Sequence, residues 1–144
     1  MENILDMVMA LKNVSIFENI PVHVLADVAE ITTVQQINRG ETFIRKGDLG
    51  ENMYIIKSGK AKIHDGDQII TTLDENQIVG ELAILAPVKR TADVTALEHL
   101  TVFVINREYF ADLLSEEIEI VKGVMVSLVE RIVLNNEKLK SIAQ

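Results

Sequence analysis

Residues 80–94 read Gly80-Glu81-Leu82-Ala83-Ile84-Leu85-Ala86-Pro87-Val88-Lys89-Arg90-Thr91-Ala92-Asp93-Val94. Gly80 leads directly into an apolar segment that can form one helical turn, whose free backbone amides point outward and can hold an anion. The Glu81 carboxylate accepts hydrogen bonds from a hydroxyl pair such as that of a ribose, but it repels a bare phosphate. Arg90 offers a planar, permanently charged fork that matches phosphate oxygens. This stretch thus combines a sugar acceptor with a phosphate donor, although a Glu and an Arg nine residues apart also suit a surface ion pair worth about 0–1 kcal/mol.

The chain around this stretch is rich in glycine and in short runs of β-forming residues. Six of the seven glycines lie from Gly40 to Gly80, whereas both flanks are almost free of glycine. The β-forming runs are Val34 to Ile37, Thr42 to Ile44, Met53 to Ile56, Ala61 to His64, Ile69 to Leu73, Val94 to Leu97 and Leu100 to Ile105. Asp65-Gly66 is a hairpin signal, because the tight turn needs a positive φ that glycine adopts freely. Many short strands joined by turns predict an antiparallel barrel, roll or sandwich.

Helical periodicity returns on both sides of these strands. Apolar residues recur at helical spacing over residues 5–11, and a second helical segment from about Pro21 to Glu30 begins with a proline, which suits a helix start. Beyond the strands, the pattern predicts a helix over 107–114 and a long helix from about Glu116 to the end. The expected fold class is therefore mainly β with flanking helices (α+β), an antiparallel β-roll or jelly roll with an N-terminal helical segment and two C-terminal helices.

The last predicted helix carries a heptad stripe. Its members alternate at spacings of three and four: Ile118, Val121, Met125, Leu128, Ile132, Asn135, Leu139 and Ile142. A single Asn in such a seam fixes register and strand number, so the stripe predicts a parallel helix pair between two subunits of a homodimer. The same stripe also suits packing against the β-core, and a second strip of Val124, Val129 and Val133 leaves room for both arrangements.

Length and composition are those of one globular domain, expected over residues 1–144. The chain is 48% apolar and 25% charged, with a net charge of −8, 4% aromatic residues and no tryptophan. Nucleic acids are bound through clustered basic residues and, for single strands, exposed aromatic side chains, so nucleic acid is excluded as a partner. The expected parts are a helical segment over about 1–30, a β-roll over 31–105 that contains residues 80–94, and hinge, lid and dimerisation helices over 106–144.

Three features indicate where the protein works. The chain has no cysteine, which fits a reducing compartment. Its first residues include Glu2 and Asp6, where a secretory signal needs a basic start. The most apolar long stretch, residues 118–134, contains four charged side chains and does not suit a membrane span. We therefore expect a cytoplasmic protein without direct membrane insertion.

Three further motifs precede residues 80–94. They are Gly40-Glu41-Thr42-Phe43-Ile44, Gly47-Asp48-Leu49-Gly50-Glu51 and Met53-Tyr54-Ile55-Ile56-Lys57-Ser58-Gly59. Together with the order Gly-Glu-Leu-Ala, a short insert and Arg-Thr-Ala-x-Val, they closely resemble the cyclic nucleotide-binding domains of catabolite activator protein, protein kinase A regulatory subunits and cyclic nucleotide-gated channels. Residues 80–94 are similar to the phosphate-binding cassette of that family, and the resemblance extends from about residue 10 to 140.

The resemblance implies a regulatory sensor, not an enzyme, whose β-roll holds a 3′,5′-cyclic nucleotide beneath the cassette. By position, Glu81 would bind the ribose 2′-hydroxyl and Arg90 the cyclic phosphate. The other ligand-binding positions implied are Gly80, which allows close approach, the backbone amides near Leu82, Ala83 and Thr91, and the inward-facing Ala92. Cyclic AMP or cyclic GMP is the only ligand implied, and no further cofactor is expected.

The family's last helix swings toward the bound base and caps it. This would place Leu128, Arg131 or Ile132 over the purine and couple nucleotide binding to movement of the C-terminal helix. On residue type alone, Arg131 is expected to be a solvated charge on the helix face. The chain carries no sequence of a kinase, a channel or a helix-turn-helix, so we expect either a stand-alone sensor subunit or the regulatory part of a larger protein, whose effector domain lies outside residues 1–144.

Three positions depart from the family's usual pattern: Val79 replaces an aromatic, Asn76 replaces a turn glycine, and Asp93 replaces a small polar residue. Asn tolerates left-handed backbone geometry, so the turn should survive. Asp93 would oppose a phosphate, but strand alternation turns it outward if Ala92 and Val94 face the pocket. Thr91 can accept a hydrogen bond from the guanine amino group. Cyclic AMP binders with the same Arg-Thr-Ala exist, however, and cyclic AMP is favoured slightly over cyclic GMP.

Two other functions are weighed against the sensor. A degenerate member of the family would keep the fold and the dimer helix without binding nucleotide, although Glu81 and Arg90 are both present. A cupin-like metalloenzyme also wraps a β-barrel around its ligand, but it needs clustered histidines and carboxylates. The three histidines, His23, His64 and His99, lie far apart in the sequence and are expected on the solvated surface, so no metal site is predicted. No phosphate loop or nucleophile elbow is present either, so no catalytic residue is predicted.

Overall fold

The structure is a computed structural model and describes residues 3–143. Met1, Glu2 and Gln144, which belong to the single domain expected over 1–144, lie outside the described residues, so the acidic start expected at Glu2 is not described. The helical elements of the described residues are α1 (Ile4–Leu11), the 3₁₀ turn η1 (Ser15–Phe17), α2 (Val22–Glu30), the 3₁₀ turn η2 (Glu81–Ile84), α3 (Arg107–Glu116) and α4 (Ile118–Ala143).

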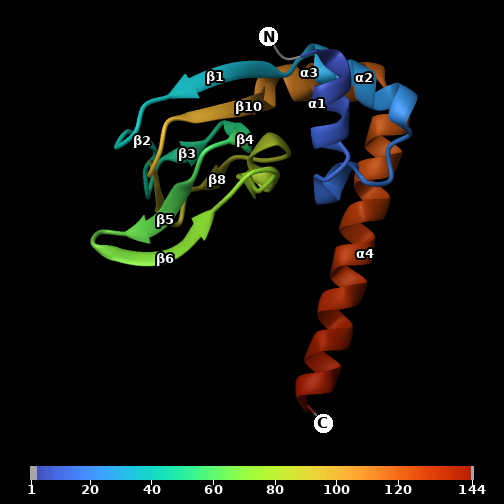
Figure 1. Cartoon of the computed structure of the whole chain (residues 1–144). Coiled ribbons are helices and arrows are strands. Elements are labelled where there is room, and N and C mark those ends of the chain that lie inside the picture. Colours follow the sequence, from blue (N-terminus) through green and yellow to red (C-terminus); the bar gives the residue numbers. More distant parts are fainter. Residues whose placement is uncertain (1–2, 144) are drawn as a thin grey trace.

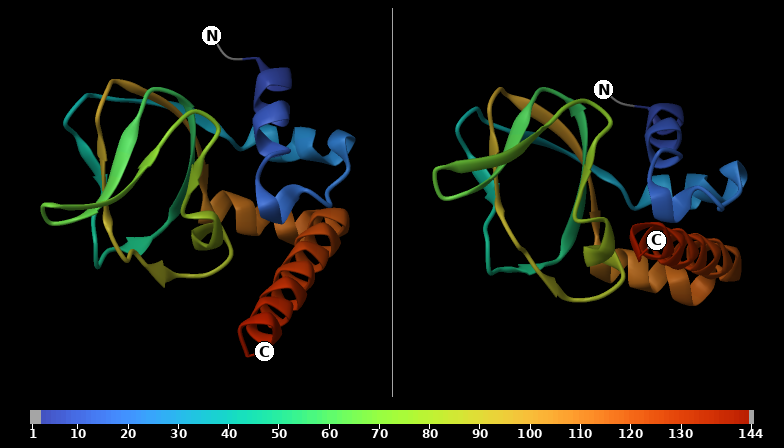
Figure 2. Two further views of the ribbon diagram at one scale, coloured as in Figure 1. Left: turned by 60° about the horizontal axis from the view of Figure 1, so that its bottom comes forward. Right: turned by 90° about the horizontal axis from the view of Figure 1, so that it is seen from below.

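The strands form antiparallel sheets. They are β1 (Thr33–Ile37), β2 (Thr42–Ile44), β3 (Leu49–Gly50), β4 (Asn52–Ser58), β5 (Ala61–Asp65), β6 (Gln68–Leu73), β7 (Ile78–Val79), β8 (Val88–Lys89), β9 (Asp93–Ala96) and β10 (Leu100–Asn106). One sheet has the order β1-β10-β4-β7 and a second has the order β2-β9-β5-β6, while β3 pairs with β8. The sheets curl around one another, and the helices gather on one side of them (Figure 2). This confirms the expected class, mainly β with flanking helices.

Strands β4 and β10 are buried on both faces. In β4, Met53 and Ile55 pack with the helices, whereas Tyr54 and Ile56 face the core between the two larger sheets. The same alternation separates Phe103 and Ile105 from Val102 and Val104 in β10. Successive strand side chains point to opposite faces, so a continuous apolar run is required where both faces are covered. These two strands therefore join the sheets to a second buried cluster, called the helical cluster here, which is formed mainly by residues of α1, η1, α2, α3 and α4.

The helical cluster holds the beginning of α4 firmly. Ile120 and Val124 are buried in it, and a Cβ at Gly123 would lie 2.8 Å from Cγ1 of Ile20. Phe110 of α3 is fully buried, and its ring centroid lies 5.6 Å from that of Phe17. Beyond the cluster, α4 continues as a straight rod in which residues 132–142 are all exposed (Figure 1).

Most of the heptad stripe on α4 lies on the exposed side of the helix. Its exposed members are Ile118, Met125, Ile132, Asn135, Leu139 and Ile142, while Val121 and Leu128 are half-buried. The six exposed members do not pack on the β-core; α4 packs in the helical cluster through Ile120 and Val124, and of the stripe Leu128 packs against the same cluster. Val129 and Val133 of the second strip are exposed as well.

Local turn chemistry agrees with the sequence at two positions. Gly66 has φ 58° in the hairpin between β5 and β6, and Asn76 has φ 70° before β7. Strands β3, β7 and β8 were not predicted, because each has only two residues and such a length carries no periodicity. Within residues 3–143, no helix is both long and apolar enough to cross a membrane.

Candidate functional site

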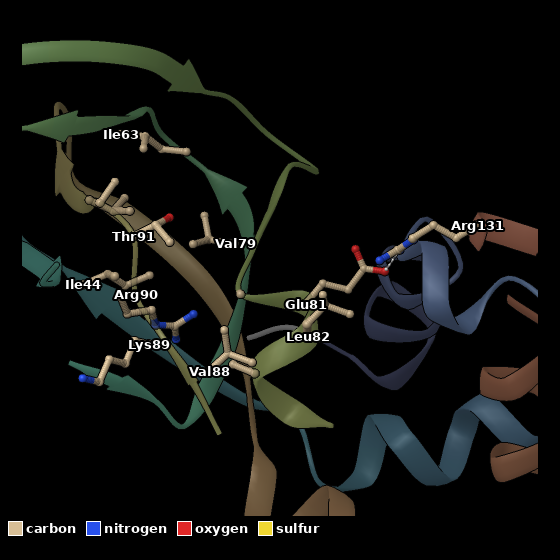
Figure 3. Close-up of a pocket in the computed structure, with 14 residues that line it drawn as sticks. Ile44, Ile63, Val79, Glu81, Leu82, Val88, Lys89, Arg90, Thr91 and Arg131 are labelled. Carbon is tan, nitrogen blue, oxygen red and sulfur yellow. Dashed lines mark hydrogen bonds and ion pairs between the residues drawn. The ribbon is translucent and has the colours of Figure 1, made fainter. Parts of the chain in front are cut away.

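A cavity of about 400 Å³ lies over η2 and the chain that follows it. Figure 3 shows its lining residues: Ile44, Ile63, Val79, Gly80, Glu81, Leu82, Ala83, Val88, Lys89, Arg90, Thr91, Ala92, Val94 and Arg131. All seven ligand-binding positions expected from the sequence are in this set. The volume lies within the range of roughly 300–1,000 Å³ typical of small-molecule sites. The walls are largely aliphatic, with charged groups at separate points.

Gly80 shapes the floor of the cavity. It has φ 78° and ψ 29°, a left-handed conformation that favours glycine. A Cβ here would collide with Nη1 of Arg90 and lie 2.9 Å from the carbonyl oxygen of Asn52. The amide of Ala83 donates to the Gly80 carbonyl at 3.0 Å, which closes the turn η2. The Ala83 amide, one of the backbone amides expected near the phosphate, is engaged inside this turn in the structure.

Arg90 is one of three cationic residues that line the cavity, together with Lys89 and Arg131, and it is half-buried. Its Nη2 donates to the Asn52 carbonyl, and its guanidinium lies against Gly50, where an added Cβ would be 2.7 Å from Arg90 Cζ. Burial lowers the pKa of Arg90 from its ordinary value, and Tyr54 offsets this in part. Among residues 3–143, no carboxylate lies within ion-pair distance of Arg90. The structure thus holds a desolvated cation beside a cavity without a neutralising acid.

Glu81 connects the cavity to α4 and to η1. Its Oε1 accepts hydrogen bonds from the amide of Ile16 at 2.9 Å and from Nη2 of Arg131 at 2.8 Å. Arg131 also donates to Oγ of Ser15 at 2.8 Å. The dashed line in Figure 3 marks the ion pair, whose side chains are 21% and 33% exposed for Glu81 and Arg131. The expectation that Arg131 is a solvated charge is therefore wrong, because folding brings a carboxylate 50 residues away in sequence into contact with it.

The three base-cap candidates lie in different surroundings. Arg131 lines the cavity, whereas Leu128 and Ile132 do not. Leu128 packs against the helical cluster, and Ile132 is exposed. In this structure α4 therefore reaches the cavity through Arg131 alone of the three.

Asp93 points away from the cavity, as strand alternation predicts. Ala92 and Val94 line the cavity, and Asp93 does not. The Asp93 carboxylate instead accepts from the amide of Lys46 at 2.8 Å. No acid therefore opposes an anion from this position of β9.

Two supports of Arg90 received no role from the sequence. Gly50 lies within a glycine-containing motif, but the motif itself does not show that the glycine faces Arg90. Asn52 acts through its backbone carbonyl, which any residue type supplies, so residue identity carries no signal. Both contacts arise because β3 and β4 lie beside the cassette in the folded chain.

One histidine departs from the expectation of solvated surface residues: His23 and His99 are exposed as expected, whereas His64 is not. His64 is half-buried and bonded at both ring nitrogens, to Thr95 Oγ1 at 2.7 Å and to the Gly66 carbonyl at 2.8 Å. His99 is exposed and contacts Gln36 Oε1 at 2.6 Å. The part of the chain that the structure describes contains no group of three or more His, Cys, Asp or Glu residues able to hold a metal ion.

Comparison with known proteins adds a family model and several relatives. The model described as "Cyclic nucleotide-binding domain" matches residues 34–117, more than half of the chain. A cAMP-dependent protein kinase regulatory subunit from Debaryomyces hansenii is 28% identical over 114 residues, which cover 78% of this chain and 25% of that protein. The cGMP-dependent protein kinase 2 of Homo sapiens is 32% identical over 107 residues, covering 69% of this chain and 14% of that protein. The chain thus spans a quarter or less of the length of these two relatives.

Two solved structures are similar. The N-terminal domain of a transcriptional regulator from Streptomyces coelicolor A3(2) superposes with a TM-score of 0.82, covers 90% of this chain and 94% of its own, and is 21% identical, a level that supports the fold alone. A cyclic nucleotide-binding-like protein from Brucella abortus has a TM-score of 0.71 and is 26% identical, with 76% of this chain and 98% of that chain covered.

Proposed function

The chain belongs to the family of cyclic nucleotide-binding domains, and on that premise we propose that it is a regulatory sensor that binds a 3′,5′-cyclic nucleotide in the cavity over η2. Cyclic AMP is favoured slightly over cyclic GMP. The observation that carries the proposal is the half-buried Arg90, which faces the cavity and has no carboxylate partner among residues 3–143. A desolvated guanidinium without a counterion gains most from an anion that can reach it.

A cyclic phosphate fits the charges around this cavity better than a phosphate monoester does. It carries one negative charge and two free oxygens, which one guanidinium can neutralise with a bidentate contact. A monoester carries about two negative charges near neutral pH, and the Glu81 carboxylate on the same wall would repel the second. The same carboxylate accepts a hydrogen bond from a ribose 2′-hydroxyl. We therefore assign Arg90 to the phosphate and Glu81 to the ribose.

The ion pair between Glu81 and Arg131 supports a route from ligand to α4. A ribose hydroxyl that donates to Glu81 shares the carboxylate with Arg131, which changes the strength of the contact that holds α4 against the cassette. A ligand shifts a conformational equilibrium only by its differential affinity for the two states, and the shift is reciprocal. Nucleotide binding and the position of α4 are coupled in this proposal through one carboxylate.

Calorimetry with cyclic AMP, cyclic GMP and the two linear monophosphates tests the proposed function. We expect both cyclic nucleotides to bind more tightly than the linear forms. Arg90→Ala should weaken cyclic nucleotide binding by at least about 30-fold, or about 2 kcal/mol, because the anion loses a half-buried cation that no carboxylate neutralises. Arg39→Ala is a matched control, since Arg39 is exposed and does not line the cavity. Absence of binding by the folded wild-type chain would favour the degenerate module instead.

We also propose that α4 pairs with α4 of a second copy through its heptad stripe. The support is that most apolar members of the stripe are exposed along the rod and that Asn135 lies in the same seam. Ile132→Asp should convert a dimer into a monomer in sedimentation equilibrium. Ile70→Asp changes an equally exposed side chain on β6 and should leave the dimer intact. A wild-type chain that sediments as a monomer at high concentration would contradict this pairing.

A further inference from the structure

Arg107, the first residue of α3, makes contacts that its place at a helix start does not require. Its Nη1 donates to the carbonyl oxygen of Gly50 at 2.6 Å and to that of Ala83 at 3.3 Å. Its backbone amide donates to the Glu51 carbonyl at 2.8 Å. Within residues 3–143, no carboxylate lies at ion-pair distance from this half-buried guanidinium. Arg107 therefore acts as a clamp on two backbone segments.

Those two segments pack against the Arg90 guanidinium. A Cβ built on Gly50 would lie 2.7 Å from Arg90 Cζ and 3.1 Å from the Cβ of Ala83, so Gly50 packs against both. Three consecutive carbonyls are engaged here: those of Gly50 and Glu51 by Arg107, and that of Asn52 by Arg90. The backbone that bonds Arg90 is thus the continuation of the backbone that Arg107 holds.

We propose that Arg107 is a positioning residue for the anion site. It does not line the cavity, but it fixes the segment 50–52 against η2 and thereby holds the guanidinium of Arg90 at the place where the proposed phosphate would bind. This inference rests on the proposed function for its ligand. The placement of Arg90 itself is a property of the ligand-free chain.

The fold does not depend on this clamp alone. Asn106 caps α3 by accepting from the amide of Glu108 at 2.9 Å, and it donates to Oδ1 of Asn52 at 2.9 Å. Phe110 anchors α3 in the helical cluster. A second cavity of about 390 Å³, lined by Arg107 and Glu51 among others, opens beside the clamp, so water can reach the two carbonyls if the guanidinium is removed. We therefore expect Arg107→Met to fold.

The first test compares cyclic nucleotide binding by wild type, Arg107→Met and Arg107→Lys. Arg107→Met should weaken binding at least tenfold, because a displacement of Arg90 by even 1 Å spoils a bidentate contact. Arg107→Lys should recover part of the loss, since an ammonium can donate to both carbonyls. Arg39→Met, which makes the same change of charge at an exposed turn, should bind like wild type. A folded Arg107→Met with affinity within twofold of wild type would overturn the proposal.

The second test separates positioning of Arg90 from a general weakening of the cassette. In an Arg90→Ala background, Arg107→Met should cost no further affinity, whereas a structural role would lower affinity by the same factor in both backgrounds. The loss should also be equal for a cyclic nucleotide and its 2′-deoxy analogue, because the carboxylate of the ribose acceptor Glu81 is held by the Ile16 amide and by Arg131. A smaller loss for the 2′-deoxy analogue would show that the ribose contact is disturbed and would contradict the proposal.

A third measurement works without ligand. The side-chain Nε–H signal of Arg90 in a nitrogen–proton correlation spectrum should shift in Arg107→Met and stay in place in Arg39→Met. If the wild-type chain bound no cyclic nucleotide, the proposed function would fail, while this signal would still decide whether Arg107 positions Arg90. An unchanged Arg90 signal in a folded Arg107→Met would refute the inference by itself.

Discussion

Gly50→Ala should damage anion binding without unfolding the protein. Gly50 does not have a positive φ, so its backbone accepts alanine without strain. The new methyl group would stand 2.7 Å from Cζ and 2.8 Å from Nε of Arg90, against an ordinary carbon contact of about 3.5–4.0 Å. The guanidinium must therefore retreat by about 1 Å. Because it is the far end of a flexible side chain, the retreat costs little in folding free energy.

The substitution should instead lower the affinity for the cyclic nucleotide. A hydrogen bond to a charged group contributes about 1.5–3 kcal/mol, and a shift of about 1 Å removes much of it. We expect Gly50→Ala to weaken cyclic nucleotide binding by about 10- to 100-fold, or about 1.4–2.8 kcal/mol. The free energy of unfolding in urea should change by less than about 1 kcal/mol, since alanine also restricts the unfolded chain.

Calorimetry and urea unfolding on the same preparations provide the assay. Gly66→Ala is the control, because a Cβ there meets nothing within 4 Å and only the left-handed φ of 58° is disturbed. It should lose about 1 kcal/mol of stability and bind nucleotide normally. If Gly50→Ala bound as tightly as wild type, the packing of Gly50 against Arg90 would not determine where the cation stands.

Three further outcomes are expected from the same contacts. Glu81→Ala should weaken binding of the parent cyclic nucleotide about tenfold, and calorimetry with the 2′-deoxy analogue should show almost no effect; an equal loss for both would refute the ribose assignment. Arg131→Gln should abolish the nucleotide-dependent change in hydrogen exchange along residues 125–135 of α4, and a persistent change would show that α4 senses the ligand elsewhere. Burial and then Asp27 raise the pKa of Glu117, so the folded chain binds that proton more tightly and its ionisation opposes folding as the pH rises. Glu117→Gln should therefore raise the melting temperature at pH 7 but not below the ordinary pKa of 4.5, and an equal gain at both pH values would contradict this account.

Short-range patterns in the sequence were sufficient for the order of the elements. Periods of two and of about 3.6 residues depend on neighbours along the chain, which is why the longer strands and all four α-helices of the described residues were predicted near their observed bounds. The two-residue strands β3 and β8 were not predicted, because two residues show no periodicity. Their pairing, which places Gly50 of β3 beside the cassette, depends on contacts between distant parts of the chain.

The candidate residues of the site were predicted from the sequence, but their contacts in the folded chain were not. A guanidinium for a phosphate and a carboxylate for a hydroxyl are properties of the side chains themselves, so the sequence, together with its family resemblance, predicts Arg90 and Glu81 as the candidate binding groups. The same sequence left Arg131 as a solvated charge and assigned no role to Arg107. Only the folded chain brings Arg131 to Glu81 and Arg107 to the carbonyls behind Arg90, because these contacts join residues 50 and 57 positions apart and no local pattern encodes them.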